Sequence, residues 1–110
     1  MIFDQEGNTV IITQEKVSIL ELIKKLEIIY IRFQNNNIII NLTSLVSLSV
    51  NDFVEFLQIS NKHRGTKHSF VIVSDKFDTH EIPDELIVVP TLQEAKDIIE
   101  MEDIERDLGF

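Results

Sequence analysis

The densest group of potentially reactive side chains lies between positions 75 and 85, where five carboxylates surround a histidine. The group consists of Asp75, Asp78, His80, Glu81, Asp84 and Glu85. Carboxylate and imidazole groups are common protein ligands of divalent cations. One hypothesis is therefore a small-molecule or metal-binding domain, or a metal-dependent hydrolase, that uses the acidic loop 75–85. The spacing matches no metal motif, so we favour a solvated acidic loop.

Other groups that could carry out catalysis are scarce. The remaining histidines, His63 and His68, are not spaced as ligands on one face of a helix or strand. The three glycines are scattered, so the sequence has no glycine-rich phosphate loop, and no serine lies in a nucleophile motif. The sequence therefore predicts a protein that is not an enzyme, with no catalytic residue, no bound metal and no cofactor.

Composition narrows the class of partner. The chain has 110 residues, enough for one domain that spans residues 1–110. Its net charge of −9 disfavours nucleic acid, whose phosphates are bound by clustered Lys and Arg. No apolar run approaches the ~20 residues of a membrane-spanning helix, and the N-terminus has no basic segment followed by an apolar one. We expect a cytoplasmic protein that binds neither nucleic acid nor membrane.

Apolar runs predict the strands that would position these residues. The run from Ile38 to Leu42 does not alternate with polar residues, which is typical of a strand buried on both faces, and residues 69–74 and 86–89 repeat this pattern. Two further β-prone stretches, residues 1–4 and 9–13, flank a turn-type sequence and predict a hairpin. We expect Ile40 and Val71 to lie in adjacent parallel strands of one core.

Capping patterns predict where three helices begin. Ser18 with Glu21, Ser49 with Asp52 and Thr91 with Glu94 each have the spacing of a capping box. The first helix should end at residues 35–37. The second should run from Ser49 to Arg64, with Gly65 in the left-handed conformation and with an inward stripe at Val50, Phe53, Val54 and Leu57. The expected fold is α/β, a mixed and mostly parallel sheet with an N-terminal hairpin and helices packed on it.

The C-terminal segment carries a second apolar stripe. Ile98, Met101, Ile104 and Leu108 recur at near-helical spacing among acidic residues. The third helix should therefore extend past the core. We expect that Ile104, Leu108 and Phe110 pack back on the domain or that this end of the chain frays, in preference to forming a partner site.

Two segments together resemble a STAS domain of the anti-sigma-factor antagonist type. They are the stretch from Ile38 to Leu45, followed by a helix, a basic turn and a second strand, and the ending Val89-Pro90-Thr91-Leu92-Gln93-Glu94-Ala95. The resemblance covers nearly the whole chain. It implies a small, non-catalytic regulatory or scaffolding module that binds a protein partner.

The chain departs from this family at its regulatory site. In the antagonists a Ser at the start of the second helix is phosphorylated, whereas by spacing this chain has Val50 there, and Asn41 replaces an acidic residue at the end of the central strand. The phospho-switch is therefore predicted to be absent. Ser49 could accept a phosphate, although an ordinary helix cap is the interpretation we favour.

The resemblance also implies where a partner binds. The family's partner-facing loop precedes the second helix, so the candidate partner-binding residues are Ser44, Ser47, Ser49 and Asn51. A homodimer stays an open alternative. The chain is also similar to short flavobacterial proteins labelled ribonuclease Z, but enzymes of that name hold two zinc ions with a His-x-His-x-Asp-His motif, which this sequence lacks.

Overall fold

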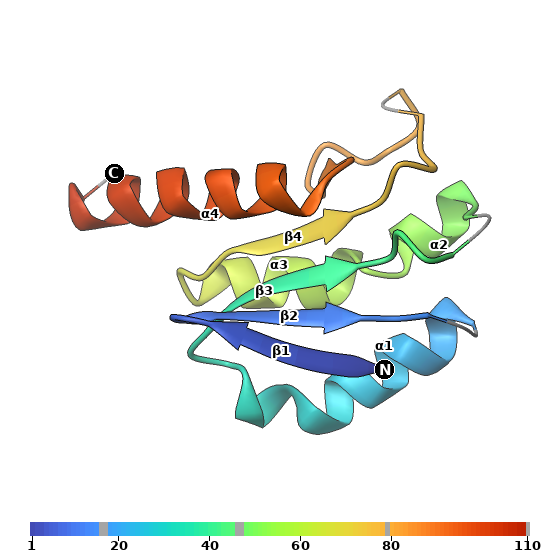
Figure 1. Ribbon diagram of the computed structural model, residues 1–110, viewed down its shortest axis with the longest axis horizontal. Helices are drawn as coiled ribbons and strands as arrows, with labels where there is room; N and C mark the ends of the chain where they lie inside the picture. Colours follow the sequence, from blue (N-terminus) through green and yellow to red (C-terminus); the bar gives the residue numbers. More distant parts are fainter. Residues whose placement is uncertain (16–17, 46–47, 79, 110) are drawn as a thin grey trace.

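The computed structural model describes residues 1–15, 18–45, 48–78 and 80–109. One mixed sheet has the strand order β1-β2-β3-β4-β5, with β1 antiparallel to β2 and every other pair parallel (Figure 1). The strands are β1 Ile2–Glu6, β2 Thr9–Thr13, β3 Asn37–Asn41, β4 Phe70–Val73 and β5 Ile87–Val89. The helices are α1 Ile19–Ile29, a 3-10 helix η1 Tyr30–Arg32, α2 Val50–Val54, α3 Leu57–Gly65 and α4 Leu92–Asp107. The predicted α/β class, with its N-terminal hairpin and mostly parallel sheet, is confirmed.

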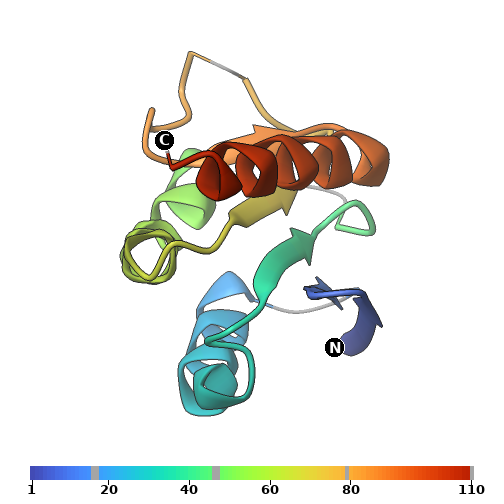
Figure 2. The same cartoon turned by 90° about the vertical axis from the view of Figure 1, so that its left-hand side faces the viewer.

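Helices cover both faces of the sheet. Helices α1, α2 and α3 lie on one face and α4 lies on the other (Figure 2). Side chains of the first three helices pack in one apolar cluster, and side chains of α4 pack in a second. Because both faces are covered, β3 and β4 are buried almost throughout, as their apolar runs predicted. Within the described part of the chain, no helix has the length and apolar character needed to cross a membrane.

The predicted pairing of β3 with β4 is confirmed, but the expectation of one shared core is wrong. Ile40 lies opposite Ile72, and Ile39 lies opposite Val71. Successive side chains of a strand point to opposite faces. Ile40 therefore packs in the cluster under α1 and α3, whereas Val71 packs in the cluster under α4.

The second predicted helix is two helices. The chain leaves α2 after Val54, and the Phe56 N–H bonds to the Phe53 carbonyl oxygen at 3.0 Å, three residues back. This tighter turn brings both phenylalanines into the core. Gly65 does not adopt the predicted left-handed conformation, which instead occurs at Lys67, with φ of 67°.

The first helix also ends earlier than predicted. α1 stops at Ile29 and continues as η1, so the chain has left the α-helix before Asn35. Its start is as expected, because the Ser18 hydroxyl accepts a hydrogen bond from the Glu21 N–H at 3.2 Å.

Helix α4 extends to Asp107, as predicted, but its outer apolar residues do not pack back. Ala95 and Ile99 hold the first half of the helix on the sheet. Ile104 and Leu108 remain exposed, so the expectation that they pack back is wrong, and Phe110 lies outside the described residues. Polar contacts hold the second half instead.

Those contacts form a network at the amino ends of β3 and β4. The Asn37 side-chain amide donates to Asp103 at 3.2 Å, and the Ser69 hydroxyl donates to Glu102 at 2.6 Å. Arg106 donates to the Ser69 hydroxyl at 3.0 Å, and Arg64 pairs with Glu102 at 3.1 Å. The acidic and basic residues of the inner helix face are therefore used to attach α4 to the sheet.

Candidate functional site

Of the predicted partner-binding residues, Ser44 follows β3 at its carboxyl end, Ser49 caps α2 and Asn51 lies in the first turn of α2 (Figure 1). Asn41 ends the strand with an Asx turn, in which its side-chain oxygen accepts hydrogen bonds from the Thr43 N–H at 3.2 Å and the Thr43 hydroxyl at 2.9 Å. The Leu45 N–H then bonds to the Leu42 carbonyl oxygen at 3.1 Å. These turns shape residues 41–45, where Ser44 is exposed.

The start of α2 is defined by a complete capping box. The Ser49 hydroxyl accepts from the Asp52 N–H at 3.2 Å, and the Asp52 carboxylate accepts from the Ser49 N–H at 2.9 Å. The predicted cap is confirmed. Ser49 is exposed but its hydroxyl is used in the cap, whereas Asn51 is exposed on the first turn, and Ser47 lies outside the described residues.

An exposed valine adds apolar surface beside these polar groups. Val54 is 39% exposed, so its predicted inward orientation is wrong. The core beside this segment is filled instead by Phe53 and Phe56. Because Asn51 and Val54 are three residues apart, they share one face of the short helix. Val50, at the position where the antagonists carry the phosphorylated Ser, is half-buried and has no hydroxyl.

The charged side chains of the acidic loop, residues 75–85, do not converge on one point. The Asp75 carboxylate pairs with Lys76 at 2.7 Å, which lowers its pKa, and Asp78 accepts a hydrogen bond from the backbone N–H of His80 at 2.9 Å. Phe77 and Ile82 pack against the core and leave the charged side chains outside. Among the described residues, no three side chains of His, Asp or Glu come together in a way that could hold a metal ion.

A buried tyrosine–histidine pair was missed by the sequence analysis. The His63 Nε2 lies 2.7 Å from the Asn36 carbonyl oxygen, and His63 Nδ1 lies 2.7 Å from the Tyr30 hydroxyl. Because a carbonyl oxygen can only accept, Nε2 carries the proton and Nδ1 accepts the hydrogen of Tyr30. The sequence did contain an indication that His63 is buried, since it lies four residues after the apolar Ile59 and therefore on the same face of the helix.

Burial keeps this pair neutral. Burial lowers the pKa of His63; the hydrogen bond to Asn36 opposes this shift, and the nearby His68 adds to it. Burial also raises the pKa of Tyr30. The pair fastens η1 to α3. Its depth in the core gives it a structural role.

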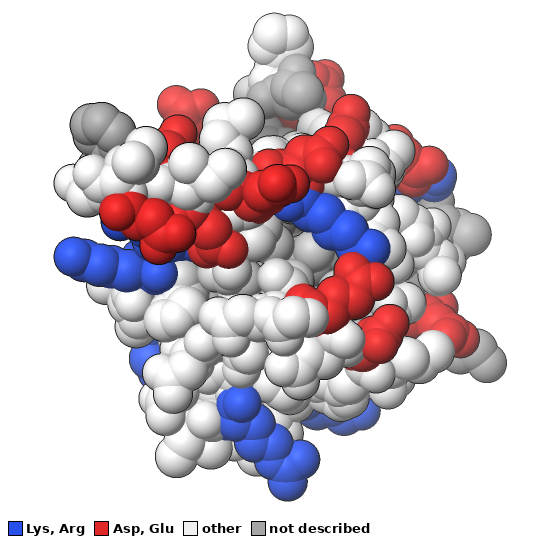
Figure 3. All heavy atoms as spheres, turned by 60° about the vertical axis from the view of Figure 1, so that its left-hand side comes forward, with Lys and Arg blue, Asp and Glu red and all other residues white. Residues whose placement is uncertain are grey.

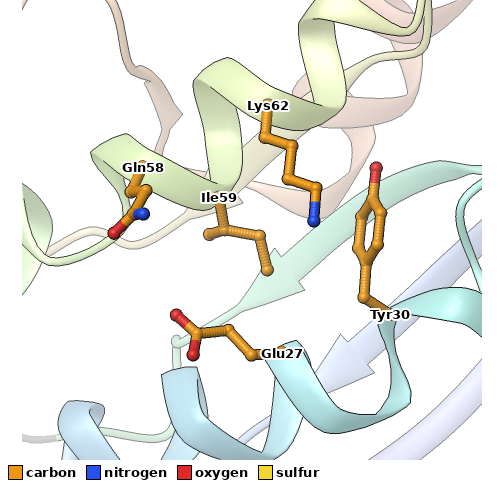
Figure 4. Close-up of a pocket in the computed structure, with 5 residues that line it drawn as sticks. All are labelled: Glu27, Tyr30, Gln58, Ile59 and Lys62. Atoms are coloured by element: carbon orange, nitrogen blue, oxygen red, sulfur yellow. The ribbon is translucent and has the colours of Figure 1, made fainter.

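A groove of about 250 Å³ lies beside this pair, between α1 and α3 (Figure 4). Glu27 and Lys62 stand on its opposite walls, and the Lys62 ammonium lies 4.8 Å from the centre of the Tyr30 ring. Both charged side chains are solvent-exposed. We assign this groove no ligand, because the buried polar group among the residues that line it, the Tyr30 hydroxyl, is already bonded to His63.

No protein-family model matches the sequence, and no curated protein matches it.

Proposed function

We propose that this chain is a non-catalytic, cytoplasmic regulatory or scaffolding module that binds a protein partner through the β3–α2 loop and the exposed face of α2. One observation carries the proposal. Ser44, Asn51 and Val54 are exposed, while the turns and the cap that position them are made by other groups. These three side chains are therefore not needed to hold the turns or the cap, and they are available to contact a partner.

In the described residues, hydrogen bonds hold both ends of this surface, through the Asn41–Thr43 turn and the Ser49–Asp52 cap. Preformed loops lose less conformational entropy on binding than mobile ones do. A mixture of hydrogen-bonding and apolar groups is also typical of protein–protein interfaces. The STAS resemblance supports the same location. Since Val50 offers no hydroxyl, we propose that phosphorylation at this position does not control the interaction.

The test compares two double variants with the same added charge. Ser44→Arg with Asn51→Arg alters the proposed surface, and Gln58→Arg with Asn61→Arg places the same two arginines at exposed positions of α3. Immobilised wild-type protein should retain a stoichiometric protein partner. The first variant should lose that partner and the second should keep it. Both should melt within a few degrees of the wild type, as surface variants do.

If both double variants captured the protein partner equally well, the partner would bind at a different surface of the domain. The alternative function, a metal or small-molecule activity of residues 75–85, predicts a different result. In that case zinc or magnesium should raise the melting temperature, and His80→Ala should abolish the rise.

A further inference from the structure

The outward face of α4 carries an apolar stripe that nothing in the described chain covers. Met101, Ile104 and Leu108 are 60%, 53% and 68% exposed. Their spacing of three and four residues places them along one line of the helix, across it from the buried Ala95 and Ile99, and Ile104 also borders the groove between α4 and Glu6 and Thr9 of the sheet. Large apolar side chains gathered on one exposed line usually mark a contact surface.

Acidic side chains border this stripe. Glu100 and Asp107 lie along one flank, Glu105 lies along the other, and all three are exposed. Figure 3 shows acidic groups following the upper part of the molecule, where α4 runs. The two cations of the helix contact the body of the domain: Lys96 pairs with Glu6 at 2.7 Å, and Arg106 donates to the Ser69 hydroxyl at 3.0 Å. The outward face is therefore apolar in the middle and negative at its edges.

The inner face holds the stripe in a fixed position. Ala95 and Ile99 are buried against the sheet, and Glu102 is bonded to both Ser69 and Arg64. A partner would therefore meet a rigid helix and would not have to order it. Met101 can adapt to side chains of different shape, because its thioether side chain is flexible and polarizable.

We propose that this face of α4 binds a basic amphipathic helix of a partner protein. Apolar side chains of that helix would pack on Met101, Ile104 and Leu108, and its flanking Lys or Arg would pair with the acidic borders. A symmetric contact between two copies would bring acidic borders near each other, and an anionic lipid surface would be repelled. Charge complementarity thus favours a basic helix. The stripe lies toward the end of the sheet opposite α2, so this surface is independent of the proposed loop site (Figure 1).

The test uses two synthetic helical peptides as probes. Both carry leucines at three-and-four spacing, and their flanks are lysine in one and glutamate in the other. The lysine peptide should bind the full-length chain in a fluorescence anisotropy titration, and the glutamate peptide should not. Binding should weaken as the salt concentration rises from ~0.1 M to ~1 M, which shortens the Debye length from ~10 Å to ~3 Å.

Matched variants locate the binding surface. Ile104→Ser with Leu108→Ser should weaken binding of the lysine peptide at least about tenfold, which corresponds to ~1.4 kcal/mol. Ile28→Ser with Ile31→Ser should leave the affinity unchanged, although these isoleucines are 79% and 74% exposed, because they belong to α1 and η1 on the opposite face. Glu100→Lys with Glu105→Lys should also weaken binding.

Three results would overturn the proposal. The first is no binding of the lysine peptide, and the second is binding that both serine double variants weaken equally. The third is a wild-type dimer in sedimentation that Ile104→Ser with Leu108→Ser dissociates, without any peptide binding, which would make a second copy of the chain the occupant.

Discussion

At position 63 a histidine is fully buried with both ring nitrogens in hydrogen bonds. The neutral tautomer satisfies both partners, because Nε2 donates to Asn36 and Nδ1 accepts from Tyr30. Protonation would put two donors on the ring and a charge in the core. The residue therefore makes folding sensitive to pH.

We predict that stability falls when the pH drops below the pKa of His63 in the unfolded chain, ~6.5. Burial lowers the folded pKa, so the unfolded chain takes up the proton first. The stability that neutral His63 contributes is complete at pH values above its pKa in the unfolded chain. It decreases as the pH falls through that pKa, and it levels off below the pKa of His63 in the folded chain. Urea unfolding between pH ~7.5 and ~5.5 should show a steeper loss for the wild type than for His63→Gln.

His80 provides the matched control because it is exposed. His80→Gln should keep the wild-type slope of unfolding free energy against pH. If His63→Gln and the wild type have the same slope, the buried histidine is not the group that titrates.

Residues with local partners were the predictable ones. Ser49 and Asp52 cap a helix through a spacing of three residues, and that bond formed as expected. Tyr30 and His63 are 33 positions apart. Their contact depends on how α1 and α3 cross on the sheet, which no local pattern specifies. The same limit applies to Val54, since no local pattern shows that Phe53 and Phe56 take the core side of this segment.

Among the elements, β3 is the centre of the sheet. It lies between β2 and β4, and Ile40 is paired with Ile12 on one side and Ile72 on the other. Its apolar run was sufficient to predict a strand buried on both faces. The run could not show the register with β4, which sets Ile40 opposite Ile72 and therefore puts Val71 on the other face.

Ile40→Ala should lower the free energy of unfolding by ~2–5 kcal/mol, because it removes buried methyl groups and leaves a cavity. Ile28→Ala is the control, since Ile28 is exposed on α1 and should change stability by no more than ~0.5 kcal/mol. Urea unfolding measures both. A loss below ~1 kcal/mol for Ile40→Ala would show that β3 does not hold the core together.

Helix α4 shows why an apolar pattern alone misplaces a helix face. The apolar Ile104 and Leu108 led to the prediction that their face of the helix packs against the domain. In the structure, the opposite face is attached instead, because its polar residues bond to Asn37 and Ser69. These partners come from strand ends at least 33 positions away. The polar network turns the acidic, apolar-striped face outward.

At the scale of the whole molecule, charge is unevenly distributed. The net charge is −9, and α4 contributes an exposed acidic border. A polyanion would have to approach against this field, whereas a basic partner would be attracted by it.

We therefore expect purified protein to leave a precursor transfer RNA intact when zinc is added. RNA binding requires clustered Lys and Arg to replace counterions, and in the described residues the acidic loop does not bring three metal-ligating side chains together. Gel analysis of the RNA after incubation with increasing amounts of protein measures this directly, with a metal-free sample as the control. Zinc-dependent cleavage that copurifies with the chain and disappears in His80→Ala would contradict the prediction. It would assign the function to residues 75–85, because His80 is the one histidine in that loop.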